Sequence, residues 1–456
     1  MRIFATIMKT FAINTLGCKV NQYESQQVRE LLERLGLDQV ETSKEKPDLV
    51  VINTCCVTHT ASAKSRKYIR KAQKLSPGAV IIACGCLPTV QIGEFSVFDE
   101  NIRVIAARRD LAADLTRIVN SKTAAGTAIK ADNRSKIHHK ADLAHQPLLP
   151  PITAFKGHTR AFLKVQDGCD GRCSYCIIPK TRPIVHSKQP AQVLREARTL
   201  VEAGHKEIVV TGVFLGAFGQ PTVRRSRWPN QRNDKLSELL EELAQVPDLK
   251  RIRLSSLEPA DVTQRLLDTF CNYDNIMPHL HLSLQSGSDA VLKRMCRQYR
   301  ADDFAETIRL ITSRLDKPAM TADFIVGFPG ETDADFEATV ALAKESGFAK
   351  MHIFRFSPRK GTPAACMKDT VDKRVVKERA QILRDLDAEL QYKFRQQFVG
   401  ETAGILIEKD DFQAWGRAER YFKVHINNTH KAFHRNDLVE VRLAESNADG
   451  MVGSVE

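Results

Sequence analysis

Three cysteines in the segment GCDGRCSYC, residues 168–176, form the pattern in this chain most suggestive of chemistry. Cys169, Cys173 and Cys176 follow a C-x3-C-x2-C spacing and offer three thiolates from one short loop. A structural zinc site takes four ligands, whereas thiolates also hold iron–sulfur clusters. Three cysteines on a four-iron cluster leave one iron open to a further ligand. The spacing favours such an open cluster over the alternatives, a zinc site or a redox switch.

Five further cysteines lie in the first 90 residues. Cys18, Cys55 and Cys86 each lie at the carboxyl end of a predicted strand, and Cys56 and Cys84 are adjacent extras that the residues alone would also allow as ligands. Cysteines at strand ends are often merely buried, so a structural role stays open. The last three cysteines are scattered singly, and we expect buried or incidental thiols: Cys271, Cys296 and Cys366.

The elements that position the first group alternate between strand and helix over residues 8–118, which predicts a doubly wound parallel α/β domain. Ligands gather at the carboxyl ends of the strands in such sheets, so cysteines distant in the chain can converge there. The predicted strands and helices are KTFAINTLG (9–17), QYESQQVRELLERLG (22–36), DLVVINTC (48–55), THTASAKSRKYIRKAQKL (58–75) and AVIIACGC (79–86).

Residues 119–154 are polar and aperiodic, which predicts a linker. A second alternation over residues 155–390 contains six strand patterns and predicts a central partial (β/α)6 barrel, with chemistry at the strand carboxyl ends. The six patterns are AFLKVQ, EIVVTGV, RIRLSS, HLHLSLQ, MTADFIVGF and MHIFRFS. Short strands separated by polar turns over residues 391–456 predict a small antiparallel β-barrel of oligonucleotide-binding-like size.

The composition narrows the class of protein. The chain has 456 residues, a formal net charge of +13 and 11 cysteines. The odd cysteine count favours metal ligands or catalytic thiols in a reducing cytosol over disulfides. No run approaches the length of a membrane span, so we expect a cytoplasmic protein without a membrane partner. The positive charge favours a polyanionic partner such as nucleic acid.

GCDGRCSYC resembles the signature of radical S-adenosylmethionine (SAM) enzymes, with Tyr175 as the aromatic before the last cysteine. The resemblance implies a [4Fe–4S] cluster on Cys169, Cys173 and Cys176, with SAM chelating the open iron. It also implies one-electron cleavage of SAM to a 5′-deoxyadenosyl radical that abstracts hydrogen from an unreactive carbon.

The segments TLGCKVNQYES, VINTCCVT and CGCLP resemble the N-terminal domain of the radical SAM methylthiotransferase family, and further matches run through the barrel to FSPRKGTPAA. The resemblance covers almost the whole chain. It implies a second [4Fe–4S] cluster on Cys18, Cys55 and Cys86, whose open iron carries the inserted sulfur, and a C-terminal TRAM domain. One departure is Pro183, where the family usually has glycine; proline forbids a positive φ there.

Three residues at the ends of predicted strands are candidates for the cofactor pocket: Thr211, Glu258 and Gln285. Each has an equally plausible structural role in capping a helix or closing a turn. Tyr175 is a fourth candidate, which either stacks on the adenine or packs the cysteine loop. Gly327, Pro329 and Gly330 either let a backbone approach the adenosyl group or only make a turn, and Asp323 is placed to reach into the barrel.

The N-terminal motifs look most like the family branch that acts on N6-threonylcarbamoyladenosine at tRNA position 37. This resemblance implies hydrogen abstraction from C2, coupling to a methylated sulfur, and partners that comprise tRNA (its anticodon stem-loop), a sulfur donor and an electron donor such as a flavodoxin-type protein. The alternatives are isopentenyladenosine-37, a ribosomal-protein aspartate, and a non-catalytic RNA-binding iron–sulfur sensor.

Three basic segments are candidates for RNA contacts, and a solvated surface is the alternative for each. The C-terminal region, residues 395–456, holds eight basic and ten acidic residues, so only local patches there could bind RNA. The segments are Lys64, Arg66, Lys67, Arg70, Lys71 and Lys74; Arg224, Arg225, Arg227, Trp228 and Arg232; and Arg417, Arg420, Lys423 and Lys431.

Overall fold

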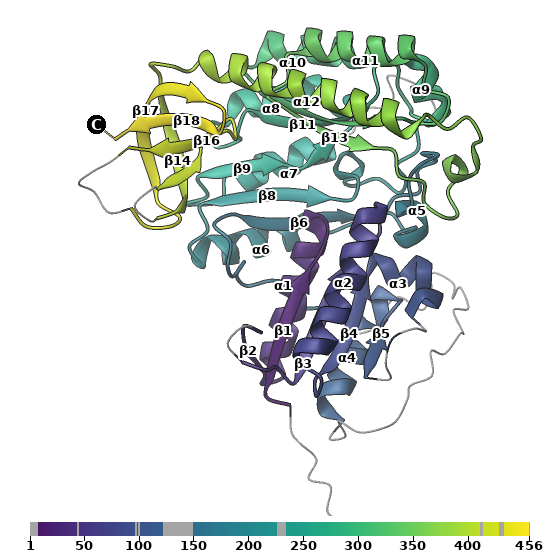
Figure 1. The fold of residues 1–456 in the computed structure, drawn as a ribbon. Helices are drawn as coiled ribbons and strands as arrows, with labels where there is room; N and C mark the ends of the chain where they lie inside the picture. Colours follow the sequence, from purple (N-terminus) through teal and green to yellow (C-terminus); the bar gives the residue numbers. More distant parts are fainter. Residues whose placement is uncertain are drawn as a thin grey trace, which may run out of the picture. The chain divides into compact units, whose positions relative to one another are not determined.

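The computed structural model describes residues 8–42, 45–95, 98, 101–121, 149–225, 234–410, 414–427 and 433–455. The chain forms two compact units, Met1–Ala154 and Phe155–Glu456 (Figure 1). Most of the predicted linker lies outside the described residues, and the finer division at residues 118 and 390 stays a prediction. No helix in the described ranges is long and apolar enough to cross a membrane.

The first unit is a five-stranded parallel sheet in the order β2-β1-β3-β4-β5, which confirms the predicted doubly wound class. All six residues of β3 are buried, as expected for a central parallel strand. The strands are β1 (Thr10–Thr15), β2 (Asp38–Gln39), β3 (Leu49–Thr54), β4 (Val80–Gly85) and β5 (Ile102–Val104). The helices are α1 (Lys19–Arg34), α2 (His59–Leu75), α3 (Cys86–Gln91) and α4 (Leu111–Asn120).

The second unit contains the six predicted parallel strands of the partial barrel, arranged in two hydrogen-bonded sheets. One sheet has the order β7-β6-β8-β9, with β7 antiparallel at its edge, and the other β10-β11-β12-β13. Residues 251–257 link them, because β9 pairs with β8 and β10 pairs with β11. The strands are β6 (Ala161–Asp167), β7 (His186–Ser187), β8 (Glu207–Gly212), β9 (Arg251–Leu254), β10 (Ser256–Leu257), β11 (His279–Gln285), β12 (Ala319–Val326) and β13 (Lys350–Arg355).

Helices alternate with these strands, and α10, α11 and α12 lie together on one side of β11–β13 (Figure 1). The side chains of Leu280, Leu282 and Leu284 on β11 are fully buried, while Ser283 and Gln285 alternate with them and line a cavity. The helices are α5 (Ile178–Thr181), α6 (Pro190–Glu202), α7 (Lys235–Ala244), α8 (Gln264–Asn272), α9 (Asp289–Arg294), α10 (Ala301–Arg314), α11 (Asp333–Ser346) and α12 (Lys373–Gln396).

The C-terminal strands close into a barrel in the order β14-β15-β16-β18-β17. The barrel was expected, but it is not wholly antiparallel, because β16 and β18 pair in parallel. A hairpin would force two paired strands to run antiparallel. The strands β16 and β18 are not joined by a hairpin, so they can pair in parallel where the barrel closes. The strands are β14 (Thr402–Lys409), β15 (Trp415–Arg417), β16 (Lys423–Ile426), β17 (Leu438–Asn447) and β18 (Gly450–Ser454).

Two arginines of β9 fasten this small barrel to the parallel strands. Arg251 donates to the carbonyls of Gly404 and Arg417 at 2.6 and 2.9 Å. Arg253, which is 1% exposed, donates to the carbonyls of Ala418 and Glu419 at 2.8 and 2.6 Å. All four acceptors are main-chain oxygens. These four contacts hold the barrel through its backbone, and side chains add to them, since Arg160, which directly precedes β6, contacts Tyr421 Oη at 2.6 Å and Glu408 Oε1 at 2.9 Å.

Candidate functional site

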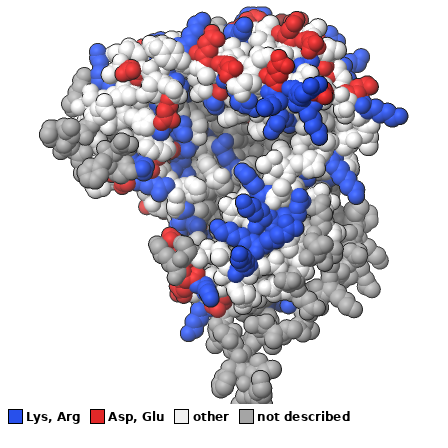
Figure 2. Space-filling model, in the orientation of Figure 1, with Lys and Arg blue, Asp and Glu red and all other residues white. Residues whose placement is uncertain are grey.

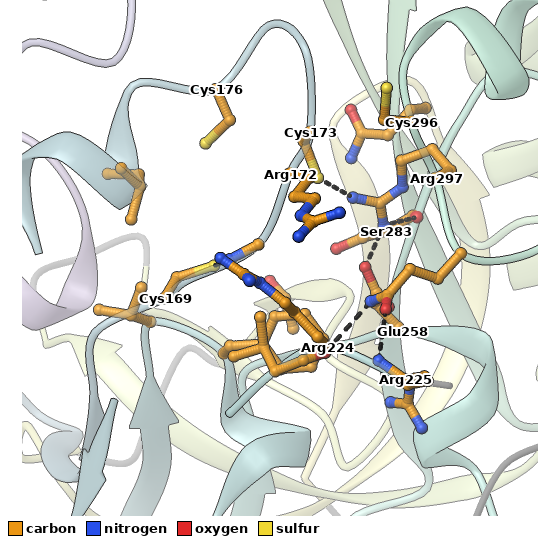
Figure 3. Close-up of a pocket in the computed structure, with 18 of the residues that line it drawn as sticks. Cys169, Arg172, Cys173, Cys176, Arg224, Arg225, Glu258, Ser283, Cys296 and Arg297 are labelled. Carbon is orange, nitrogen blue, oxygen red and sulfur yellow. Dashed lines mark hydrogen bonds and ion pairs between the residues drawn. The ribbon is translucent and has the colours of Figure 1, made fainter. Parts of the chain in front are cut away.

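A cavity of about 600 Å³ lies at the carboxyl ends of the parallel strands in the second unit (Figure 3). Cys169, Cys173 and Cys176 all line it, so the structure brings the predicted cysteines together. The opposite wall comes from β10, β11 and the segment after α9. Its volume is in the range of pockets that hold a small organic ligand.

The loop that carries these cysteines is anchored at its start. Arg182 donates from Nη1 to both carboxylate oxygens of Asp167, at 2.7 and 2.9 Å, and Gly168 N donates to Asp167 at 2.8 Å. Burial alone would raise the pKa of Asp167, but Lys164 and Arg182 outweigh it and hold that pKa well below the usual range. Asp167 is therefore a permanent anion at the entrance to the loop.

Pro183 lies between two residues, Arg182 and Ile184, whose main chains approach the start of the cysteine loop. Gly168 has φ +80°, and a Cβ there would meet the carbonyl oxygen of Ile184 at 1.7 Å. On the other side of Pro183, the carbonyl of Arg182 accepts a hydrogen bond from Cys169 N at 2.8 Å. The positive φ that this close approach requires is thus supplied by Gly168, and the proline is accommodated.

Arg297 is the central polar residue of the cavity, and the sequence analysis did not single it out. Its Nη1 donates to Cys173 Sγ at 3.2 Å, and its Nη2 contacts Glu258 Oε1 at 2.6 Å (Figure 3). Burial alone would lower the pKa of Arg297, but the Glu258 carboxylate outweighs it, so that pKa is raised. Tyr299, held by the Leu284 carbonyl at 2.7 Å, accepts from Arg297 Nε. A fixed positive charge therefore points at one of the three sulfurs.

Two of the three thiols, Cys169 and Cys176, are held in the neutral form. Burial raises the pKa of Cys169 to about 11 and that of Cys176 to about 12. The neighbouring thiols raise both values further, because ionised sulfurs so close together repel one another. Three thiols in one place become thiolates when metal cations bind to them, and that binding would release protons. This donor set fits an iron cluster.

Three of the four further candidates from the sequence line the cavity, namely Tyr175, Glu258 and Gln285. Gln285 has φ +73°, an uncommon conformation for a residue with a side chain and one that often marks functional sites. Thr211 is 1% exposed within β8 and is not among the residues that line this cavity; Val213 and Phe214 line it instead.

The glycines of the segment VGFPGE make a turn. A Cβ at Gly327 would meet Val376 of α12 at 2.3 Å, and the Gly330 carbonyl accepts from Arg294 at 2.8 Å. Asp323 is not on the cavity wall and contacts His281 instead. Cys271, Cys296 and Cys366, expected to be buried or incidental, are all exposed. Of the three, Cys296 has φ +56° and lines the cavity.

The second group of cysteines lies in the first unit, at the edge where the strand order reverses between β1 and β3. Cys18 follows β1, Cys55 follows β3 and Cys86 follows β4. Because β1, β3 and β4 are neighbours in the sheet, the three cysteines meet at one edge. Burial raises the pKa of Cys55 to about 11, and Cys86 and Cys18 add to it. A Cβ at Gly17 would meet Cys55 Sγ at 3.1 Å. Such a switch point is where doubly wound sheets bind ligands.

Two polar residues join these strand ends. Asn21 donates to the carbonyls of Leu16 and Thr54 at 2.8 and 2.9 Å, and its Oδ1 lies 4.0 Å from Cys86 Sγ. Arg108 Nη2 donates to Cys86 Sγ at 3.0 Å. Neither residue was predicted, because nothing in their local sequence indicates a contact with a distant cysteine.

The two adjacent cysteines differ in their surroundings. Cys84 belongs to the hydrophobic core of the first unit, and its sulfur lies 3.7 Å from the Ile52 carbonyl. Cys56 is fully buried beside Cys55. The Cys84 side chain thus packs in the core, while Cys86, two residues on, lies with Cys55 and Cys18.

The basic segments have different environments. On α2, Lys64, Lys67, Lys71 and Lys74 recur at helical spacing, are exposed, and pair with no acid among the described residues. Figure 2 shows a cluster of basic side chains where Figure 1 places α2. Arg66 of this helix is half-buried, and Arg70 lies 5.7 Å from the Phe98 ring.

The other basic side chains are mostly held by nearby residues. Arg224 pairs with Asp170, and Arg225 with the buried Asp261. In the C-terminal barrel, Arg417 donates to Tyr421 O, Arg420 to Lys317 O, and Lys423 pairs with Asp449. Arg227, Trp228, Arg232 and Lys431 lie outside the described residues.

Comparison with known proteins identifies the family. Residues 163–343 match the radical SAM superfamily, and residues 10–106 match the Uncharacterized protein family UPF0004. A threonylcarbamoyladenosine tRNA methylthiotransferase, MtaB, of Bacillus subtilis is 34% identical over 96% of this chain and 94% of its own. The chain belongs to the radical SAM methylthiotransferase family. The Chlamydia pneumoniae protein of the same name is 33% identical over 99% of both chains.

A second set of methylthiotransferase relatives bears another name. A tRNA-2-methylthio-N(6)-dimethylallyladenosine synthase of Bartonella bacilliformis is 33% identical over 88% of this chain and 86% of its own. Family membership makes the protein an enzyme, and a radical SAM domain implies a [4Fe–4S] cluster and SAM. The non-catalytic sensor is therefore set aside.

The fold has a counterpart among solved structures. A radical SAM methyltransferase, TsrM, from Kitasatospora setae aligns with a TM-score of 0.51 at 14% identity, over 76% of this methylthiotransferase and 73% of that chain. At this identity the likeness concerns the fold alone.

Proposed function

We propose that this methylthiotransferase modifies C2 of N6-threonylcarbamoyladenosine at tRNA position 37, giving 2-methylthio-N6-threonylcarbamoyladenosine. The observation that carries the proposal is the second cysteine triad, Cys18, Cys55 and Cys86, gathered at a sheet switch point in a unit separate from the first triad. Hydrogen abstraction by radical SAM chemistry needs only one cluster, whereas sulfur insertion needs a second site. The names of the relatives at 33–34% identity support the choice of substrate.

The first triad has the environment that a SAM-binding cluster requires. Cys169, Cys173 and Cys176 would hold three irons, and Tyr175, Glu258 and Gln285 line the adjoining space for SAM. When bound, the cluster and SAM supply a radical able to take hydrogen from an unreactive carbon. The role of the chain is to present three thiolates, balance their charge with Arg297, and limit water in the cavity.

The second triad would hold the sulfur-donating cluster. Asn21 ties together the ends of β1 and β3, so Cys18 and Cys55 are fixed relative to each other. Arg108 brings a positive charge to Cys86 Sγ, as Arg297 does to Cys173. Both sites combine a thiol triad with one arginine, which suits an anionic thiolate cluster.

The exposed lysines of α2 are the part of the first unit best suited to the tRNA backbone. The N-cap of this helix, Thr58, lies three residues after Cys55, and the helix begins at His59, so the lysines follow closely on the second triad in the chain. Phosphate contacts of this kind position an RNA without reading its sequence. A cytoplasmic location, a sulfur donor and a flavodoxin-type electron donor belong to the same proposal.

The test is mass spectrometry of tRNA nucleosides from cells that lack the protein, complemented with wild type or variants. We expect the methylthiolated threonylcarbamoyl nucleoside to vanish, and to return with wild type but not with Cys169→Ala or Cys18→Ala. Cys56→Ala is the matched control for Cys55→Ala, because both residues are buried neighbours. The control should restore the product.

The other outcomes separate the alternatives. If the product lost is 2-methylthio-dimethylallyladenosine, the enzyme class stands and the proposed nucleoside is wrong. If tRNA is unchanged and a ribosomal-protein aspartate loses its methylthio group, the substrate is a protein. If no methylthio product changes, the proposed function fails.

A further inference from the structure

His281, Asp323 and His352 form a cluster inside the partial barrel that neither cysteine triad uses. Their ligand-capable atoms all lie within 4.8 Å of one another. The three residues come from adjacent strands, since β11, β12 and β13 are neighbours in the sheet. Asp323 and His352 are direct cross-strand partners, and His281 pairs with Thr321, two residues before Asp323. Side chains two apart on a strand share a face, so all three project to one side.

That side is the inner face of the barrel. On β11 the fully buried Leu280 and Leu282 flank His281, whereas Ser283, on the same face as His281, lines the catalytic cavity. Two residues along a strand span about 7 Å, so the cluster lies next to the cavity along β11. It is set in a rigid sheet, which is the kind of support that a precise site needs.

The geometry of the pair His281–Asp323 suits a shared ion. His281 Nε2 lies 3.2 Å from Asp323 Oδ2. Two ligand atoms bound about 2.0–2.1 Å from one tetrahedral ion lie about 3.3 Å apart. The other ring nitrogen, His281 Nδ1, lies 2.8 Å from Thr321 Oγ1. Metal-binding histidines have such a hydrogen bond on the second nitrogen, which fixes the ring and leaves Nε2 free for the ion.

His352 completes the set. Its ring centroid lies 5.5 Å from that of His281, and its nitrogens have no hydrogen-bond partner among the described residues. The carboxylate of Asp323 contacts His281 and also interacts electrostatically with His352. Two imidazoles and one carboxylate are a donor set for divalent first-row metals and leave coordination positions open.

We propose that His281, Asp323 and His352 bind a divalent first-row transition-metal ion on the inner face of the barrel, next to the cavity. This ion is additional to any iron on the cysteines. Its open positions face the barrel interior, so an oxygen of a molecule in the barrel can become a further ligand.

The test is a Mn²⁺ titration of the anaerobically reconstituted holoenzyme, in which the cysteines are already occupied by iron. Binding is followed by loss of the six-line electron paramagnetic resonance signal of free Mn²⁺. We expect one site per chain, with affinity reduced about tenfold or more by His352→Ala and by Asp323→Asn. Zn²⁺ should displace the bound Mn²⁺, because it binds such ligands more tightly.

Matched variants keep the test decisive. His425 and Asp449 form another His–Asp pair at 2.8 Å, exposed on the C-terminal barrel, so His425→Ala should leave Mn²⁺ affinity unchanged. His352 is exposed on β13, so its replacement is not expected to unfold the barrel, and circular dichroism checks this. The proposal is overturned if neither Mn²⁺ nor Zn²⁺ is retained beyond the iron content. It is equally overturned if wild type, His352→Ala and Asp323→Asn bind Mn²⁺ equally well.

Discussion

The two cysteine triads reach similar surroundings by different routes. Cys169, Cys173 and Cys176 come from one loop, and their proximity follows from their spacing. Cys18, Cys55 and Cys86 come from the ends of three strands, and only the parallel sheet brings them together. In both cases burial raises thiol pKa values and one arginine donates to one sulfur. Cysteines from one loop and cysteines from three separate strand ends can thus form thiol sites with similar surroundings.

The largest expected effect is a difference between the reaction products of variants in the first triad and variants in the second triad. Cys176→Ala should abolish both 5′-deoxyadenosine formation and methylthiolation, because the SAM-binding cluster is lost. Cys86→Ala should abolish methylthiolation but retain 5′-deoxyadenosine formation. Iron should fall by about half in each, if each triad holds one four-iron cluster. The measurements are iron analysis and chromatography of the nucleosides formed after reduction.

Cys84→Ala is the control for the second triad, since Cys84 lies two residues from Cys86 but packs in the core. It should retain iron and both products. If Cys84→Ala loses iron and Cys86→Ala does not, the ligand assignment at this triad is wrong.

The next effect concerns the arginine of the first triad. Arg297→Met leaves the carboxylate of Glu258, which is 5% exposed, without its partner. Breaking a buried ion pair on one side costs about 3–5 kcal/mol of unfolding free energy. Denaturant unfolding of the apo-protein measures it, and Arg297→Met combined with Glu258→Leu should recover part of the loss. A cost below about 1 kcal/mol would contradict the contact described for Arg297.

The first site should also respond to acid through Asp261, the buried partner of Arg225. Burial raises the pKa of Asp261 to about 6, above the ordinary value of 3.8. The folded state therefore favours the protonated form, and this stabilisation is present below about pH 4 and lost as the pH rises through about 6.

Asp261→Asn stays neutral at every pH, so its stability relative to wild type should rise between pH 4 and pH 7. The expected change is about 2–3 kcal/mol, measured by denaturant unfolding of both proteins across that range. A pH-independent difference would show that Asp261 titrates normally.

The smallest effect tests the arginine of the second triad. Arg108 is more exposed than Arg297, at 22% against 6% of its side chain, so Arg108→Gln should change the unfolding free energy by less than about 1 kcal/mol. Removing a donor from Cys86 Sγ should instead lower the reduction potential of the second cluster. A redox titration followed by electron paramagnetic resonance checks this. An equal shift in both clusters would mean that Arg108 does not act locally.

Much of the fold could be predicted because the spacing of apolar residues and the residues that end each strand are local signals. The six parallel strands of the barrel and the three long strands of the first unit all lie where apolar runs end at polar or glycine residues. The parallel pairing of β16 with β18 could not be predicted, because it depends on barrel closure between strands with no hairpin between them. The break between β9 and β10 could not be predicted either, because it depends on the pairing of β9 with β8 and of β10 with β11.

The site was predictable only where spacing or strand position carries the information. Tyr175, Glu258 and Gln285 reach the cavity, but the Thr211 side chain is buried within β8 and does not. Arg297 and Arg108 are separated from the cysteines they contact by 124 and 22 residues, so no local pattern reveals them. The arginines of the C-terminal barrel were candidates for RNA, yet Arg417 and Arg420 bind main-chain oxygens within the second unit.

The attachment of that barrel through Arg251 and Arg253 has a consequence for how the protein can diverge. Both arginines bind carbonyl oxygens of Gly404, Arg417, Ala418 and Glu419, and every amino acid supplies a carbonyl. The carbonyls of Arg417, Ala418 and Glu419 would therefore remain after substitution, provided that strand register is kept. Gly404 is constrained, because a Cβ there would lie 3.1 Å from Arg251 Nη2. Replacing Arg251 or Arg253 should therefore weaken the attachment more than replacing Arg417 or Ala418, whose main-chain carbonyls would still be present.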